Sequence, residues 1–177
     1  MSAARVPMLS HPVIDAVLER HHAALGGDER TYRHHVYRCA NYQRELLGGE
    51  LPDTAALAWA VHDLGIWTAG TFDYLGPSAD LVDGFAAEFG ITEPELAQTM
   101  VLEHHGVRAR TDPLVETFRL ADRVDVGHGV LRGRIDAEFI AQVVERFPYA
   151  GFHRFLVRSG LRHLVRHPLR PLPMLRW

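Results

Sequence analysis

Two adjacent residues, His62 and Asp63, carry side chains that could bind a divalent metal ion. They end an apolar stretch in which Leu57, Val61 and Leu64 are spaced as on the buried face of a helix. A carboxylate is rarely buried unless it is paired or bound to a metal, and a neutral imidazole beside it completes a pair of ligands. The dipeptide alone is a weak signal, because His-Asp pairs are frequent by chance and an ordinary helix end accounts for them.

Three other stretches carry residues of the same two types. Each lies on an expected helix: Tyr32–Arg38 contains His34 and His35, Glu103–Gly106 contains His104 and His105, and Leu120–Asp125 contains Asp122 and Asp125. The order His, His-Asp, His-His, Asp on the helices of a small chain resembles the HD-domain superfamily of metal-dependent phosphohydrolases. The resemblance extends from about residue 32 to residue 125.

The resemblance implies a compact helical bundle with one divalent ion, held by His35, His62, Asp63 and Asp122. His35 is preferred to His34 because it begins the His-x-x-Arg pattern of such proteins, although His34 remains an alternative. Asp122 is preferred to Asp125 because it follows a Leu-Ala pair that resembles the family's Ala-Asp. Two imidazoles and two carboxylates suit Mn, Fe, Co, Ni, Zn or Mg, and the sequence does not choose among them.

Such an ion would lower the pKa of a bound water from about 16 toward about 7 and neutralise charge on a phosphoryl group. Asp63 or Asp125 could accept the proton of the water, and a histidine could protonate the leaving oxygen. Asp125 lies one turn after Asp122, so it could instead orient a ligand or a water.

The pair His104-His105 has two interpretations. In two-metal relatives, further histidines build a second site, and one of them lies between the His-Asp and His-His motifs. This chain has no histidine between His62 and His104, and only acidic residues could substitute, namely Asp73, Asp80, Asp83 and Glu88. We therefore expect one metal, with His104 or His105 as an acid or a phosphate contact. The alternative is that the pair merely caps a helix C-terminus.

All 19 basic residues are arginine, so lysine-based Schiff-base and Walker A chemistry is excluded. Any phosphate contact by a cationic side chain must use arginine or histidine. Arg38 is the best candidate because it lies one turn from His35, and Arg33, Arg108, Arg110 and Arg123 also flank the motifs. Trp67, Phe72, Asp73 and Tyr74 are weaker candidates for shaping a substrate pocket.

Three functions remain open. The first is hydrolysis of a small phosphate ester or nucleotide by a metal-activated water. The second keeps the metal and hydrates a small nitrile-like molecule, which a small apolar pocket without arginine near the metal would favour. The superfamily also includes di-iron oxygenases, but the missing histidine argues against a second iron. The third is a non-catalytic module that the metal stabilises.

Helical periodicity predicts an all-α fold with helices at about 12–25, 28–47, 53–65, 78–89, 92–105, 113–126, 136–147 and 150–167. Ser78 is expected to cap one of these helices and Thr92, with Glu95, another, and residues 66–77 are expected to form a loop. The chain of 177 residues fits one domain, with the motifs in about 28–130 and further helices and a tail in 131–177.

Composition narrows the setting and the partners. A lone cysteine, Cys39, and the lack of a signal peptide or membrane span predict a cytoplasmic protein. The excess of acidic residues makes nucleic acid an unexpected partner. The resemblance implies a small-molecule substrate that is phosphorylated. The arginines at 154, 158, 162 and 166 are interpreted as a solvated helix face. The apolar tail ending at Trp177 could pack on a second subunit or on its own domain.

Overall fold

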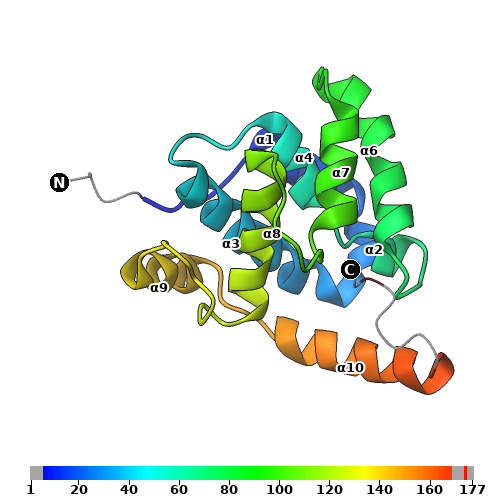
Figure 1. The fold of residues 1–177 in the computed structure, drawn as a ribbon. Helices are drawn as coiled ribbons and strands as arrows, with labels where there is room; N and C mark the ends of the chain where they lie inside the picture. The colour runs from blue at the N-terminus through cyan, green and yellow to red at the C-terminus, as the bar shows by residue number, and fades with distance from the viewer. Residues whose placement is uncertain (1–5, 169–173, 175–177) are drawn as a thin grey trace.

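The computed structural model describes residues 6–168 and Met174, and all regular structure in them is helical, as predicted. Figure 1 shows the helices packed around α3 and α4, with α10 lying across one end of the bundle. The elements are α1 (Pro12–Arg20), α2 (His22–Leu25), a 3-10 turn η1 (Gly26–Asp28), α3 (Glu29–Leu47), α4 (Asp53–Val61), α5 (Gly65–Thr68), α6 (Leu75–Phe89), α7 (Pro94–Glu103), α8 (Pro113–Val126), α9 (Ala137–Arg146) and α10 (Phe152–Arg166). Trp177 lies outside the described residues.

Helices α3 and α8 pack against each other and form the frame of the bundle. At the end of α3, Gly48 adopts a left-handed conformation (φ 72°), and its N–H donates to the carbonyls of Arg44 and Glu45. Helix α8 begins with Asp112, whose carboxylate accepts hydrogen bonds from the N–H groups of Leu114 and Val115. These local signals determine where α3 ends and where α8 begins. They therefore determine which residues of α3 face which residues of α8.

Helix α4 is buried on every side, because α1, α3, α6 and α7 surround it. Such an all-round apolar helix is typical of the centre of a domain. The ring of Trp59 stacks on Phe118 of α8 with centroids 3.6 Å apart, and its indole N–H donates to Gln43 of α3 at 2.6 Å. The end of α4, directly before His62 and Asp63, is thereby held against both α3 and α8.

The segment after α4 differs from the prediction. Helix α4 ends at Val61, His62–Leu64 form a turn, and α5 begins at Gly65, so the expected helix to Gly65 and the loop at 66–77 are both wrong in extent. Ser78 does not cap a helix, because α6 already begins at Leu75. Its hydroxyl is buried and accepts a hydrogen bond from the N–H of Gly65 at 2.9 Å.

The start of α7 also differs. Glu93, not Thr92, occupies the N-cap position, and no side chain caps the helix. Pro94 instead sets the first helical residue, since its fixed φ suits this position and it has no N–H to satisfy.

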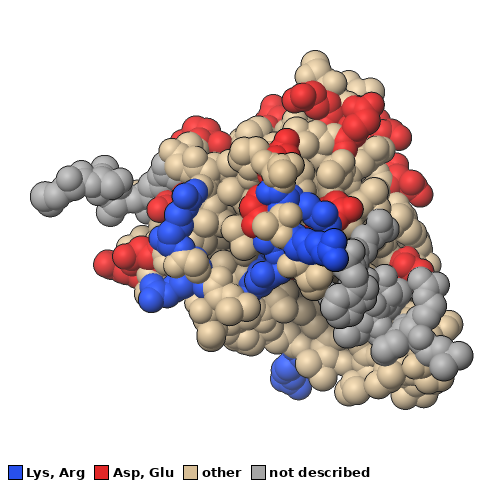
Figure 2. Space-filling model, in the orientation of Figure 1, with Lys and Arg blue, Asp and Glu red and all other residues tan. Residues whose placement is uncertain are grey.

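Charge is unevenly spread over the surface. Figure 2 shows acidic side chains along the edge formed by α6 and α7 and arginines across the centre of this face. The arginines at 154, 158, 162 and 166 of α10 are exposed. Among the described helices, none combines the length and the apolar character needed to span a bilayer.

The close approach at Gly65 generates a prediction about stability. A Cβ at this position would lie 2.6 Å from the carbonyl oxygen of Tyr74 and 2.9 Å from Oγ of Ser78. Gly65→Ala should therefore lower the free energy of unfolding in urea by about 1–3 kcal/mol. As a control, Gly84→Ala in α6 meets open space and should stabilise the protein by up to about 1 kcal/mol. Equal stability of the two variants would contradict the close contact.

Candidate metal centre

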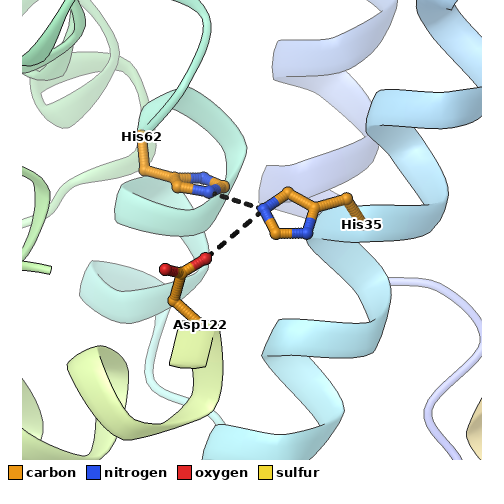
Figure 3. Close-up of side chains that lie close together, drawn as sticks. All are labelled: His35, His62 and Asp122. Atoms are coloured by element: carbon orange, nitrogen blue, oxygen red, sulfur yellow. Dashed lines mark hydrogen bonds and ion pairs between the residues drawn. The ribbon is translucent and has the colours of Figure 1, made fainter. Parts of the chain in front are cut away.

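The four predicted ligands lie together in the core. Helix α3 contributes His35, the turn after α4 contributes His62 and Asp63, and α8 contributes Asp122. Nε2 of His35 lies 3.0 Å from Nε2 of His62, 3.6 Å from Oδ1 of Asp122 and 3.7 Å from Oδ2 of Asp63. Figure 3 shows His35, His62 and Asp122 pointing toward one another. All four side chains are buried.

His34 is not part of this cluster. Its Nδ1 lies 2.8 Å from the carbonyl oxygen of Pro148, which it contacts on the outer side of α3. Of the two alternatives for a metal ligand on α3, it is therefore His35 that lies in the cluster.

The hydrogen bonds of the histidines fix where their lone pairs point. Nδ1 of His35 lies 2.7 Å from a carboxylate oxygen of Asp125, and Nδ1 of His62 lies 2.8 Å from the carbonyl of Trp59. Because these oxygens can only accept, each Nδ1 carries the proton, and each neutral ring has its lone pair on Nε2. The two Nε2 atoms lie 3.0 Å apart, at hydrogen-bond distance, beside two carboxylates. A proton on one of the rings would satisfy this contact, and a divalent cation bound by both nitrogens would also satisfy it.

The ligand atoms of His35, His62 and Asp122 lie within 4.8 Å of one another and could share one ion, whereas Asp63 groups with His62 and His104. Ligands about 2.1 Å from a common ion lie roughly 3–3.5 Å apart, close to the 3.0–3.7 Å separations found here. Two buried atoms at the cluster, Oδ1 of Asp63 and Nε2 of His104, have no hydrogen-bond partner among the described residues. Unsatisfied buried polar atoms are rare in folded proteins, so a ligand on them is the natural explanation. The donor set therefore fits a divalent metal.

His104 and His105 extend the cluster. Nδ1 of His104 bonds the carbonyl of Val101 at 2.7 Å, and its Nε2 faces Oδ1 of Asp63 at 3.6 Å. Burial opposes protonation, but the interaction with Asp63 raises the pKa of His104 above its usual value. Nδ1 of His105 lies 3.6 Å from Asp122. The pair is therefore not merely a helix cap. The triads His62-Asp63-His104 and His104-His105-Asp122 are each close enough to share an ion.

The acidic residues considered as substitutes for the missing histidine are far from this role, since Asp73, Asp80, Asp83 and Glu88 are exposed. Glu88 is bonded to Arg20 instead. Tyr74 is the residue that approaches, with its hydroxyl 2.8 Å from Nε2 of His105. We expected Tyr74 only as a shape-determining residue, because a tyrosine has no place in the histidine pattern.

Arg38 and Asp125 have a different place from the one expected. The Arg38 guanidinium is fully buried, donates from Nε and Nη2 to the Asp125 carboxylate at 2.6 and 2.8 Å, and donates from Nη1 to the carbonyls of Phe147 and Pro148. It therefore does not face the cavity beside the cluster, and the prediction of a phosphate contact there is wrong. Asp125 is fully buried too, so it orients His35 rather than accepting a proton from substrate-bound water.

The other flanking arginines are also engaged away from the cluster. Arg33 pairs with Asp15, Arg110 pairs with Glu103, and Arg123 donates to the carbonyl of Gly106. Arg108 is exposed. None of these side chains lines the cavity described below.

Electrostatic effects at the cluster separate its members. Burial lowers the pKa of His62 to about 3, so this imidazole is neutral and ready to bind a metal. Burial raises the pKa of Asp122 to about 6. Burial alone would also raise the pKa of Asp63, but the neighbouring imidazoles of His62 and His104 hold it below its usual value. Asp63 is thus the permanently ionised ligand, and Asp122 is the one that exchanges a proton near neutrality.

A cavity of about 540 Å³ opens onto the cluster, and Asp63, Tyr74, His105 and Asp122 belong to its lining. The rest of its described wall comes mainly from α10, together with Phe72, Val126 and Met174. Phe152, at the start of α10, stacks on the ring of His35 with centroids 3.9 Å apart. Sequence analysis missed this role of α10. Its apolar stripe was the available signal, but the stripe alone does not reveal which surface it covers.

Of the other shape candidates, Phe72 and Tyr74 line the cavity, whereas Asp73 is exposed. Trp67 stacks on Phe155 of α10 and donates to Asp28, outside the cavity.

Comparisons of the chain with protein-family models, with curated proteins and with solved structures find no match. The site is therefore interpreted from its own geometry.

The proton on Asp122 generates a prediction about metal affinity. A metal must displace this proton, so the affinity for Zn²⁺ or Mn²⁺ should fall as the pH drops through about 6, by about tenfold per pH unit for one displaced proton. Isothermal titration between about pH 7 and about pH 5 measures this. Asp73→Asn, at an exposed acid, should keep the same profile. A flat profile in the wild type would contradict the assignment of Asp122 as a ligand.

The buried Arg38–Asp125 pair generates a second prediction. Arg38→Met removes the partner of a fully buried carboxylate and should lower the free energy of unfolding by about 3–5 kcal/mol. Arg30→Met changes an exposed arginine of the same helix and should alter it by less than about 0.5 kcal/mol. Denaturant unfolding of the two variants measures the difference, and similar stabilities would show that the pair contributes little.

Proposed function

We propose that the protein is a metal-dependent hydrolase of the HD type, with one divalent ion on His35, His62, Asp63 and Asp122. The observation that carries this proposal is the convergence of imidazole Nε2 atoms and carboxylates beside a cavity, which Asp63 and Asp122 line. When bound, the ion supplies a Lewis acid that brings the pKa of a coordinated water toward neutrality. The open cavity favours a catalytic site over a metal that only stabilises the fold.

The side chains of the cluster can divide the proton transfers among themselves. Asp63 has an oxygen without a hydrogen-bond partner among the described residues and stays ionised, so it can accept a proton from the attacking water. His105 lines the cavity and shares a hydrogen bond with the Tyr74 hydroxyl, so this pair can deliver a proton to the leaving group. Asp125 and Arg38 hold His35 in orientation from behind.

A small phosphate ester is the substrate that the resemblance implies. A second candidate, the hydration of a small uncharged nitrile-like molecule, is favoured by the absence of arginine from the described lining of the cavity. Among the described residues of the lining, no arginine would contact a phosphate dianion. Cys39 is buried and free, which suits the reducing cytoplasm that we propose as the location of the reaction.

The test combines metal content with activity. Wild type should hold about one divalent ion per chain and hydrolyse 4-nitrophenyl phosphate or hydrate cyanamide. Asp63→Ala should lose the ion and reduce the rate by about a hundredfold or more, since even supporting residues of metal sites cost up to that factor. Asp73→Ala, at a nearby exposed acid, serves as the control and should retain both.

Each outcome discriminates among the candidates. Activity on phosphate only, or on cyanamide only, selects the reaction. Bound metal without either activity would support the metal site but overturn both proposed reactions. A folded wild type that takes up no divalent ion on reconstitution would overturn the metal centre itself.

A further inference from the structure

We infer that the substrate of this site has an uncharged, apolar body, about as large as an aryl or short alkyl group, which α10 covers. Its reacting group would face Asp63 and Asp122. This inference rests on the proposed function, because it takes the cluster as the reactive end of the cavity. It names the substrate class that neither the metal ligands nor the HD resemblance specifies.

The cavity has two chemically distinct ends. Its floor is polar and consists of Asp63, Tyr74, His105 and Asp122. Its wall is apolar and includes Phe72, Phe152, Leu156, Val157, Leu161 and Leu164. A volume of about 540 Å³ accommodates a small molecule rather than a water alone. A ligand that matches both ends has one polar, reactive group and an apolar remainder.

The charges of the lining exclude a polar body. In the described lining, the only carboxylates are those of Asp63 and Asp122, and no arginine is present. A nucleotide or a sugar phosphate would bury hydroxyls or additional phosphates against Leu156 and Leu161, where the described side chains offer no donor or acceptor to replace the lost water. The wall therefore selects against the nucleotides that HD-type motifs would otherwise allow.

Helix α10 leaves apolar side chains exposed at the cavity, where a ligand could cover them. Phe152 is its only buried residue, whereas Val157 and Leu161 remain 62% and 57% exposed although both line the cavity. An apolar ligand would cover these side chains from the cavity side. Gly160 lies between them on the same wall, and a Cβ there would meet only Phe72, at 3.9 Å. A glycine at this point keeps the cavity wide.

The first experiment measures binding of straight-chain alcohols, from ethanol to hexan-1-ol, to the metal-free and metal-loaded protein by calorimetry or NMR. The affinity should rise about fourfold for each added methylene, because each one leaves water for the apolar wall. The same gain is expected with and without metal, since the wall does not contain the ion. Equal affinities along the series would overturn the inference.

The second experiment narrows the cavity. Gly160→Phe should weaken hexan-1-ol binding by about tenfold, equivalent to roughly two buried methylenes. Val165→Phe places the same side chain on α10 at an 82% exposed position outside the cavity lining and should leave the affinity unchanged. Circular dichroism checks that both variants fold. Unchanged hexan-1-ol affinity in a folded Gly160→Phe variant would overturn the location of the site.

The two proposals fail separately in these measurements. A methylene-dependent gain in a protein that binds no metal would support the apolar cavity and overturn the metal chemistry. Metal-dependent hydrolysis with equal affinities along the alcohol series would support the proposed function and overturn the inference. Faster turnover of a nucleotide than of 4-nitrophenyl phosphate at equal concentration would also overturn it.

Discussion

The structure depends on a cluster of imidazoles and carboxylates that the core holds close together at its centre. Three imidazoles are held with Nε2 inward because their Nδ1 protons are committed to Asp125, the carbonyl of Trp59 and the carbonyl of Val101. Two carboxylates face the same point. Mutual repulsion would separate these groups if the surrounding core did not hold them. The packing of α3, α4 and α8 therefore serves to hold together side chains that repel one another without a cation.

The buried guanidinium of Arg38 links this centre to the rest of the chain. It binds Asp125 of α8 on one side and two carbonyls after α9 on the other. An ion pair at such depth gains little net stability, because desolvation offsets the attraction, but it fixes geometry. The orientation of His35 is thus determined by the position of the segment that leads into α10.

The elements that follow local rules could be predicted from sequence, and those set by long-range contacts could not. The helices α3 and α8 were placed well, because Gly48 and Asp112-Pro113 are strong local signals. The convergence of His35, His62, Asp63 and Asp122 was expected from the resemblance, and the distances confirm that these residues meet. The misplacement of Ser78 and Arg38 has one cause. A polar side chain is equally compatible with a cap, a ligand contact or a buried bond until its neighbours are known, and those neighbours are far away in sequence.

The separation between the ligands and the cavity wall has a consequence for evolution. The side chains of the candidate metal centre come from the densely packed parts of the fold, where α4 has no exposed residue from Ala55 to Val61. The wall comes largely from α10, where packing constrains Phe152 and leaves most other positions free. Substitutions in α10 can accumulate without disturbing the core. Descendants of this chain can therefore diverge in the molecules they accept while inheriting the same chemistry.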